Sequence, residues 1–141
     1  MSVLPRVVAA CLLAVLPWPA QARAQATTRP PQTARVHVVA MVERGQYGIA
    51  FEPQRTFAAP GDTLRFVQQG ALPHNVQFRS APAGAALEGG IESPMMTDRG
   101  STFDVVLDAR FVPGKYHFVC VPHEAIGMAG LLYVDAQART P

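Results

Sequence analysis

The sequence predicts an all-β domain, a β-sandwich or barrel of about seven to eight short antiparallel strands. Two observations lead to this fold class. Apolar and β-branched residues alternate with other residues over short runs, and a period of two is that of a strand with one buried face. Turn-forming residues separate these runs, and the chain contains 13 Pro and 11 Gly, so we expect no helix longer than a turn or two.

The first half of the domain contains three such runs. In residues 36–42 (VHVVAMV), valine and alanine recur at every second position. A second, shorter run covers residues 47–51 and begins beside a glycine. Two breakers follow, Pro53 and the turn at 60–62 (PGD), and β-branched and aromatic residues resume over 63–67. Each run has the length and composition of a strand.

The second half adds four runs, and one irregular segment divides them. Residues 75–78 form one run, and residues 102–107 alternate Phe, Val and Leu with other residues. A Pro-Gly turn precedes the run at 116–120, and residues 130–134 close the domain. The segment 79–100 is rich in Ala, Gly and Pro, and we expect a long loop with a short helical turn there.

The N-terminal residues have the features of a secretory signal peptide. A short basic start precedes the apolar run 7–16, and Ala22-Arg23-Ala24 fits the small-x-small cleavage rule. The run is too short to cross a bilayer as a helix, which takes about 20 residues, so we expect export to the periplasm and no membrane insertion of the mature chain. The expected organisation is a signal peptide at 1–24, a flexible leader at 25–34, the folded domain at 35–135 and a C-terminal tail at 136–141.

Charge and cysteine content narrow the function. Loss of Arg6 and Arg23 with the signal lowers the Lys and Arg count from 12 to 10, equal to the 10 Asp and Glu, so the mature chain has no basic footprint for nucleic acid.

The two cysteines differ in their expected roles. Cys11 ends a tetrad, residues 8–11 (VAAC), that looks like a lipoprotein cleavage box. Most of the apolar run lies after it, however, so a cysteine that merely sits in the signal peptide is the favoured interpretation. Cys120 alone remains after processing. A lone thiol in an oxidising compartment is buried, reactive or bound to metal.

Metal binding is favoured by the neighbours of Cys120. The spacing Cys120-x2-His123-x4-Met128 places a thiolate, an imidazole and a thioether in one inter-strand loop, and His74 stands at the start of another strand. Two imidazoles and a thiolate with a weak axial thioether are the ligands of a blue-copper electron-transfer site. Zinc more often takes several thiolates, or His with carboxylate, without Met.

These motifs resemble a known family. The segments 114–123 (GKYHFVCVPH) and 127–130 (GMAG) look like the C-terminal copper loop of plastocyanins and pseudoazurins, which are cupredoxins. The segments 60–66 (PGDTLRF) and 74–76 (HNV) resemble the part of those proteins that supplies the first His ligand. The likeness covers roughly residues 35–135 and implies a cupredoxin-like Greek-key β-sandwich.

The same resemblance implies the ligands. His74, Cys120 and His123 would be equatorial ligands of one Cu(I)/Cu(II) ion and Met128 the axial ligand, and the backbone amide of Asn75 would support the Cys sulfur. The chain departs from azurins, which have a longer loop and a disulfide. Its segment 79–100 matches no single subfamily.

The expected function is one-electron transfer by a monomeric type-1 copper carrier, through transient contacts with a cytochrome or a copper or haem enzyme. The exposed edge of His123, ringed by apolar residues 125–129, would carry the electron. The alternative is a periplasmic protein that uses the same ligands to deliver copper. An enzyme is disfavoured, because the chain lacks the His-x-His pairs of a multicopper oxidase and the second loop Cys of a binuclear centre.

Other candidate groups receive plainer interpretations. His37 and His117 are expected to be solvent-facing strand residues. Met95 and Met96 are expected to pack a loop against the core rather than bind copper. Glu124 is expected to be a solvated charge of the ligand loop that could bias partner docking.

Overall fold

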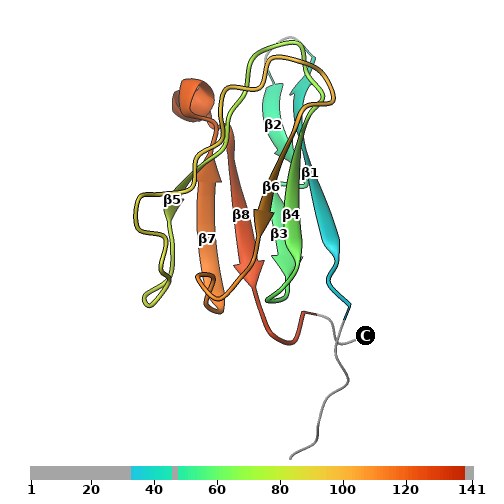
Figure 1. Ribbon diagram of the computed structural model, residues 1–141. Helices are drawn as coiled ribbons and strands as arrows, with labels where there is room; N and C mark the ends of the chain where they lie inside the picture. Colours follow the sequence, from blue (N-terminus) through green and yellow to red (C-terminus); the bar gives the residue numbers. More distant parts are fainter. Residues whose placement is uncertain (1–32, 46–47, 139–141) are drawn as a thin grey trace, which may run out of the picture. The chain divides into compact units, whose positions relative to one another are not determined.

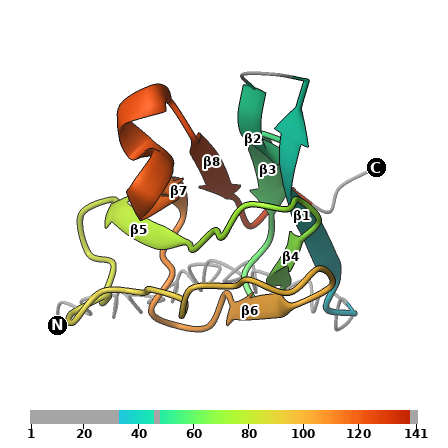
Figure 2. The same ribbon diagram turned by 90° about the horizontal axis from the view of Figure 1, so that it is seen from above.

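The computed structural model describes residues 33–45 and 48–138. These residues form two four-stranded sheets packed face to face (Figures 1 and 2). The expected signal peptide and nearly all of the expected leader lie outside the described residues. The elements are β1 (Val36–Arg44), β2 (Gly48–Glu52), β3 (Arg55–Ala58), β4 (Thr63–Gln68), β5 (Gln77–Ser80), β6 (Thr102–Val106), β7 (Gly114–Val119), the 3₁₀ helix η1 (Val121–Ile126) and β8 (Ala129–Val134).

The sandwich is confirmed, but its strands are not all antiparallel. The first sheet has the order β2-β1-β4-β6 and the second β3-β8-β7-β5. Within them, β1 pairs with β4 and β3 with β8 in parallel, and the other pairs are antiparallel. The four-residue β3 matches none of the expected runs. Strand pairing between distant segments is not encoded in local alternation, which explains both differences.

Aromatic side chains from both sheets form the centre of the core. Phe118 of β7 has its ring centroid 5.0 Å from those of Phe51 and Phe66, in edge-to-face contact. Phe78 of β5 lies 5.6 Å from Phe118. All four are buried, and edge-to-face pairs of this kind add stability beyond the area they bury. The strand ends that carry the candidate ligands are therefore attached to a tightly packed core.

The irregular segment 79–100 lies along the stretch between β4 and β5 (Figure 2). Isolated bridges join His74 to Met96 and Gln77 to Glu92, and the described segment contains no helical turn. Met96 is buried in the core while Met95 is 48% exposed. The segment thus flanks the histidine-bearing stretch with backbone hydrogen bonds rather than with extra ligands.

His37 differs from its expected position. It faces inward, half-buried, with Nε2 2.8 Å from Oδ2 of the buried Asp62. The same carboxylate accepts hydrogen bonds from the backbone amides of Arg35 and Ala59. This cluster lies where β1 begins, at the end of the sandwich away from η1 (Figure 1).

None of the described helices is long and apolar enough to cross a membrane.

Candidate metal centre

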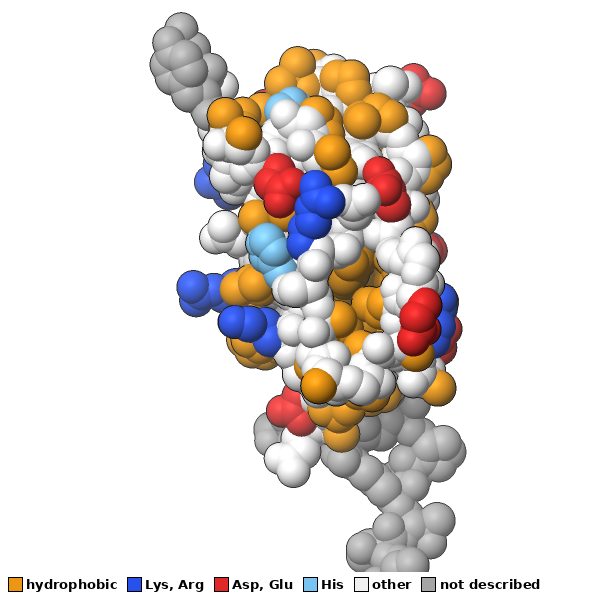
Figure 3. Space-filling view, turned by 90° about the vertical axis from the view of Figure 1, so that its left-hand side faces the viewer, with side chains coloured by type: hydrophobic (Ala, Val, Ile, Leu, Met, Phe, Trp, Pro, Cys, Tyr) orange, Lys and Arg blue, Asp and Glu red, His pale blue; other side chains and the backbone are white. Residues whose placement is uncertain are grey.

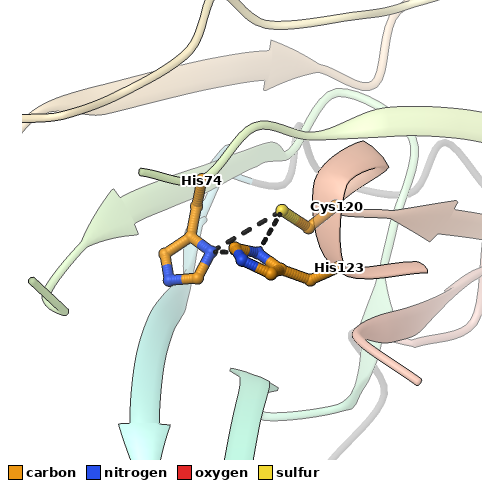
Figure 4. A group of neighbouring side chains, drawn as sticks. All are labelled: His74, Cys120 and His123. Atoms are coloured by element: carbon orange, nitrogen blue, oxygen red, sulfur yellow. Dashed lines mark hydrogen bonds between the residues drawn. The ribbon is translucent and has the colours of Figure 1, made fainter. Parts of the chain in front are cut away.

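The predicted ligands lie at one end of the sandwich, on the β4–β5 connection and on the segment between β7 and β8. His74 lies between β4 and β5, Cys120 directly follows β7, His123 is in η1, and Met128 precedes β8. The side chains of His74, Cys120 and His123 point toward one another (Figure 4). Among the described residues, these three form the group of donors whose ligand atoms all lie within 4.8 Å of one another. The fold thus brings His74 and Cys120 together, although they are 46 residues apart in the sequence.

The distances within this group suit a single metal ion. The two Nδ1 atoms are 3.2 Å apart, and Cys120 Sγ lies 3.3 Å from His123 Nδ1 and 3.6 Å from His74 Nδ1. A circle through three atoms so spaced has a radius of about 2.0 Å, close to the distance of about 2.0–2.1 Å at which imidazole nitrogen binds zinc. The site's nitrogens, thiolate and nearby thioether residue are the donors that copper prefers.

Local hydrogen bonds hold the ligand loop in a tight turn. The amide of His123 donates to Cys120 O (3.0 Å), that of Met128 to His123 O (3.1 Å), and that of Cys120 to Met128 O (3.1 Å). Pro122 lies in the first turn of η1, where its missing N–H costs nothing. Gly127 ends the helix with φ of 91°, a left-handed conformation that favours glycine. The loop's backbone therefore places the ligand residues before any metal binds.

Asn75 joins the two ligand-bearing segments. Its Oδ1 accepts a hydrogen bond of 2.8 Å from the amide of Val121, and its Nδ2 donates to Glu92 Oε1 at 3.2 Å. Its backbone amide hydrogen-bonds to Cys120, which agrees with the role that the family resemblance implied. His74 and Cys120 are thereby linked through the residues that adjoin them. Such outer contacts orient metal ligands and tune the metal.

Burial favours the neutral forms of Cys120 and His74 in the metal-free protein. It raises the pKa of the Cys120 thiol, although hydrogen bonds from the backbone amides of Asn75 and His123 act in the opposite direction. Burial also lowers the pKa of His74, the nearby His123 adds to this effect, and the carboxylate of Glu43 opposes it. A neutral imidazole can bind metal directly, whereas the thiol must first lose its proton.

Met128 is fully buried within the same core cluster as Cys120. It therefore does not contribute to the exposed apolar ring that the sequence predicted around His123. Of that ring, Ala125 and Ile126 are exposed, Ile126 by 67%. The other large exposed apolar side chains near the ligand segments are Leu72, Met95 and Val121. Figure 3 shows hydrophobic side chains gathered at the upper end of the molecule, with ionised groups mainly below them.

The sequence interpretation missed two residues that lie near His74 or bond to the backbone around it. Glu43, at the end of β1, has Oε1 3.6 Å from His74 Nε2. Gln68, at the end of β4, donates from Nε2 to Leu72 O at 2.5 Å and to Met96 O at 3.3 Å. Gln68 did carry a signal, because it continues the buried face of β4 beyond Phe66. Glu43 carried none, because a charged residue at a strand end usually faces solvent.

Comparison with known proteins gives a consistent result. The family described as copper binding proteins, plastocyanin/azurin family, matches residues 36–135. Plastocyanin from Prochlorothrix hollandica is 34% identical over 90 residues, which cover 64% of this chain and 66% of the relative. Plastocyanin from Vicia faba is 37% identical over 92 residues, which cover 62% of this chain and 90% of the relative.

Solved structures agree on the fold. A mutant plastocyanin of fern superposes with a TM-score of 0.57 at 26% identity, covering 70% of this chain and 100% of that one. The family match spans the whole sandwich and includes the segments that carry His74, Cys120, His123 and Met128. The chain therefore belongs to the plastocyanin/azurin family of copper-binding proteins.

Proposed function

We propose that this chain is a periplasmic type-1 copper protein that carries single electrons between redox proteins. The observation that carries the proposal is the convergence of the Nδ1 atoms of His74 and His123 on Cys120 Sγ. We assign these three residues as equatorial ligands and Met128 as the axial ligand. The cofactor is one copper ion per chain, which supplies a Cu(I)/Cu(II) couple when bound.

Rigid positioning of the ligands supports electron transfer. Electron exchange is fast when the ligands do not have to move between the two oxidation states. Here the donor residues lie at strand ends and in the hydrogen-bonded turn of η1. Asn75 joins the segment that carries His74 to the loop that carries the other ligands. The histidines and the thiolate are thereby held in place by the protein, whatever the charge of the metal.

The surface around His123 supports brief contacts with a partner. His74 is fully buried, whereas His123 is partly exposed, so we assign the His123 edge as the route for the electron. The neighbouring exposed residues Leu72, Val121 and Ile126 are apolar, and weak electron-transfer complexes use small interfaces of this kind. We infer that the chain acts as a monomer and meets a cytochrome or a copper or haem enzyme there.

The test is optical and electrochemical. The copper-loaded mature protein should show the intense visible absorption of a copper–thiolate bond, and Cys120→Ser should abolish it. Met95→Leu is the matched control, because Met95 is exposed and outside the proposed ligand set; it should retain the colour. An unchanged spectrum in Cys120→Ser would rule out the ligand assignment. Reversible voltammetry without metal loss supports a carrier, whereas rapid transfer of copper to a chelator would favour copper delivery instead.

A further inference from the structure

The two ring nitrogens of His74 face different partners. Nδ1 belongs to the donor group with Cys120 and His123. Nε2 lies 3.6 Å from Oε1 of Glu43 and has no hydrogen-bond partner among the residues that the structure describes. The His74 side chain is fully buried, whereas that of Glu43 is 27% exposed. A buried imidazole N–H responds to the charge of a carboxylate at this distance, because burial weakens solvent screening.

Backbone hydrogen bonds fix the carboxylate of Glu43 in this position. Its Oε1 accepts a hydrogen bond of 2.6 Å from the amide of Leu72, and its Oε2 one of 3.0 Å from the amide of Ala71. These two bonds also lower the pKa of Glu43, so the group is ionised at neutral pH. The loop that leads into His74 therefore holds an anion against the far side of the ring.

Gly70 makes room for this arrangement. A Cβ at position 70 would overlap Glu43 Oε1 and lie 2.9 Å from its Cδ. Gly70 is not among the glycines with positive φ, so its small size, and not an unusual backbone conformation, is what the site uses. Alanine at this position would push the carboxylate away from His74 without changing any charge.

We propose that Glu43 is an outer-sphere positioning residue of the copper centre. Its carboxylate holds His74 in the tautomer with the proton on Nε2, which leaves the Nδ1 lone pair free for the metal. Its negative charge also favours the more highly charged oxidised state and so lowers the reduction potential. Carboxylate–histidine–metal arrangements act in this way in general. The inference rests on the proposed function, because it takes His74 to be a ligand.

The experiment compares three variants of the full mature protein by voltammetry. Glu43→Gln removes the charge at similar size, and we expect it to raise the reduction potential, by up to a tenfold change in the equilibrium between the oxidised and reduced states, or 59 mV for one electron. Gly70→Ala, which displaces the carboxylate, should shift the potential in the same direction by less. Asp104→Asn is the control: it removes an equal charge from an ion pair with Arg65 on β4 and should leave the potential nearly unchanged.

A second readout needs no copper. Nitrogen-15 NMR of the metal-free protein should find the Nε2–H tautomer of His74 in the wild type and a mixture of tautomers in Glu43→Gln. The inference is overturned if Glu43→Gln moves the potential no more than Asp104→Asn and leaves the tautomer unchanged. If Glu43→Gln does not fold, Gly70→Ala decides the matter by the same two measurements. A wild-type protein without copper–thiolate absorption would instead refute the proposed function, and the metal-free tautomer would still report on Glu43.

Discussion

Replacing Gly130 with alanine should destabilise the protein by overpacking the core. Gly130 of β8 pairs with Phe118 of β7, and a Cβ at this position would overlap Cε2 and Cζ of the Phe118 ring and lie 3.3 Å from Cδ2. Ordinary carbon contacts are about 3.5–4.0 Å. The ring has little space to retreat, because Phe51 and Phe66 contact it edge-on with centroids 5.0 Å away. Overpacking of this kind costs about 1–3 kcal/mol.

Urea unfolding of the metal-free protein measures this effect. Gly130→Ala should lower the unfolding midpoint without changing the slope. Phe118→Leu should also be destabilising by itself, but in the double variant the smaller side chain should accept the new methyl group. We expect a coupling energy of about 1 kcal/mol or more between the two substitutions. Strictly additive effects, or a loss below about 0.5 kcal/mol in Gly130→Ala, would refute the overpacking argument.

The same substitution should also affect the metal site. Cys120 lies two residues after Phe118 and continues the extended backbone of β7, so the two side chains point to the same buried side of the chain. A displaced Phe118 should therefore shift the thiolate, and the copper-loaded Gly130→Ala protein should lose copper to a chelator faster than the wild type. Unchanged retention alongside lowered stability would show that the core and the ligand loop are mechanically independent.

Three further predictions concern the site itself. Asn75→Ala removes the hydrogen bond from the Val121 amide that joins the two ligand-bearing segments, together with the bond to Glu92, and should cost about 1–3 kcal/mol in thermal unfolding; an unchanged melting temperature would contradict this. The folded metal-free protein has a lowered His74 pKa, so the unfolded chain binds more protons and stability should fall as pH drops below about 6.5. Conversely, the raised pKa of Cys120 means that the unfolded chain loses its proton first, so stability should also fall above about pH 8.5. Urea unfolding measured across pH should show both losses of stability, and Cys120→Ser should remove the loss on the alkaline side. Met128→Leu keeps the buried volume, so stability should change by less than about 1.5 kcal/mol. Loss of the axial donor should nevertheless raise the potential, and an unaltered potential would remove Met128 from the ligand set.

The chemistry of the site could be predicted because most of it is local. Cys120, His123 and Met128 lie in one short loop, and their residue types alone indicate copper. His74 is distant in sequence: its place at the start of another strand made it a candidate, and the resemblance of residues 60–66 and 74–76 to the first ligand segment of a known family identified it as a ligand. The seven expected runs correspond to seven of the eight strands, because period-two alternation is strong wherever a strand packs on the core.

What could not be predicted depends on contacts between distant segments. Glu43 and Gln68 hydrogen-bond to backbone groups of the loop that leads into His74, and only the folded chain brings these groups together. His37 was assigned to the wrong face because both faces of VHVVAMV carry apolar residues, so alternation does not say which one is buried. Its burial depends on Asp62, which reaches it from the start of β4. The short strand β3 has too few residues to establish a period.

The parallel pairing of β3 with β8 has a consequence for the order in which the domain folds. Arg55 is opposite Leu131 in this pair, so β3 has no neighbour in its own sheet until β8, the last described strand, has joined it. The sheet can therefore be completed only after β8 is available, and a topology dominated by such remote pairings should fold in about milliseconds to seconds. The loop with Cys120, His123 and Met128 immediately precedes β8, so the docking of this one segment both closes the sheet and completes the binding site.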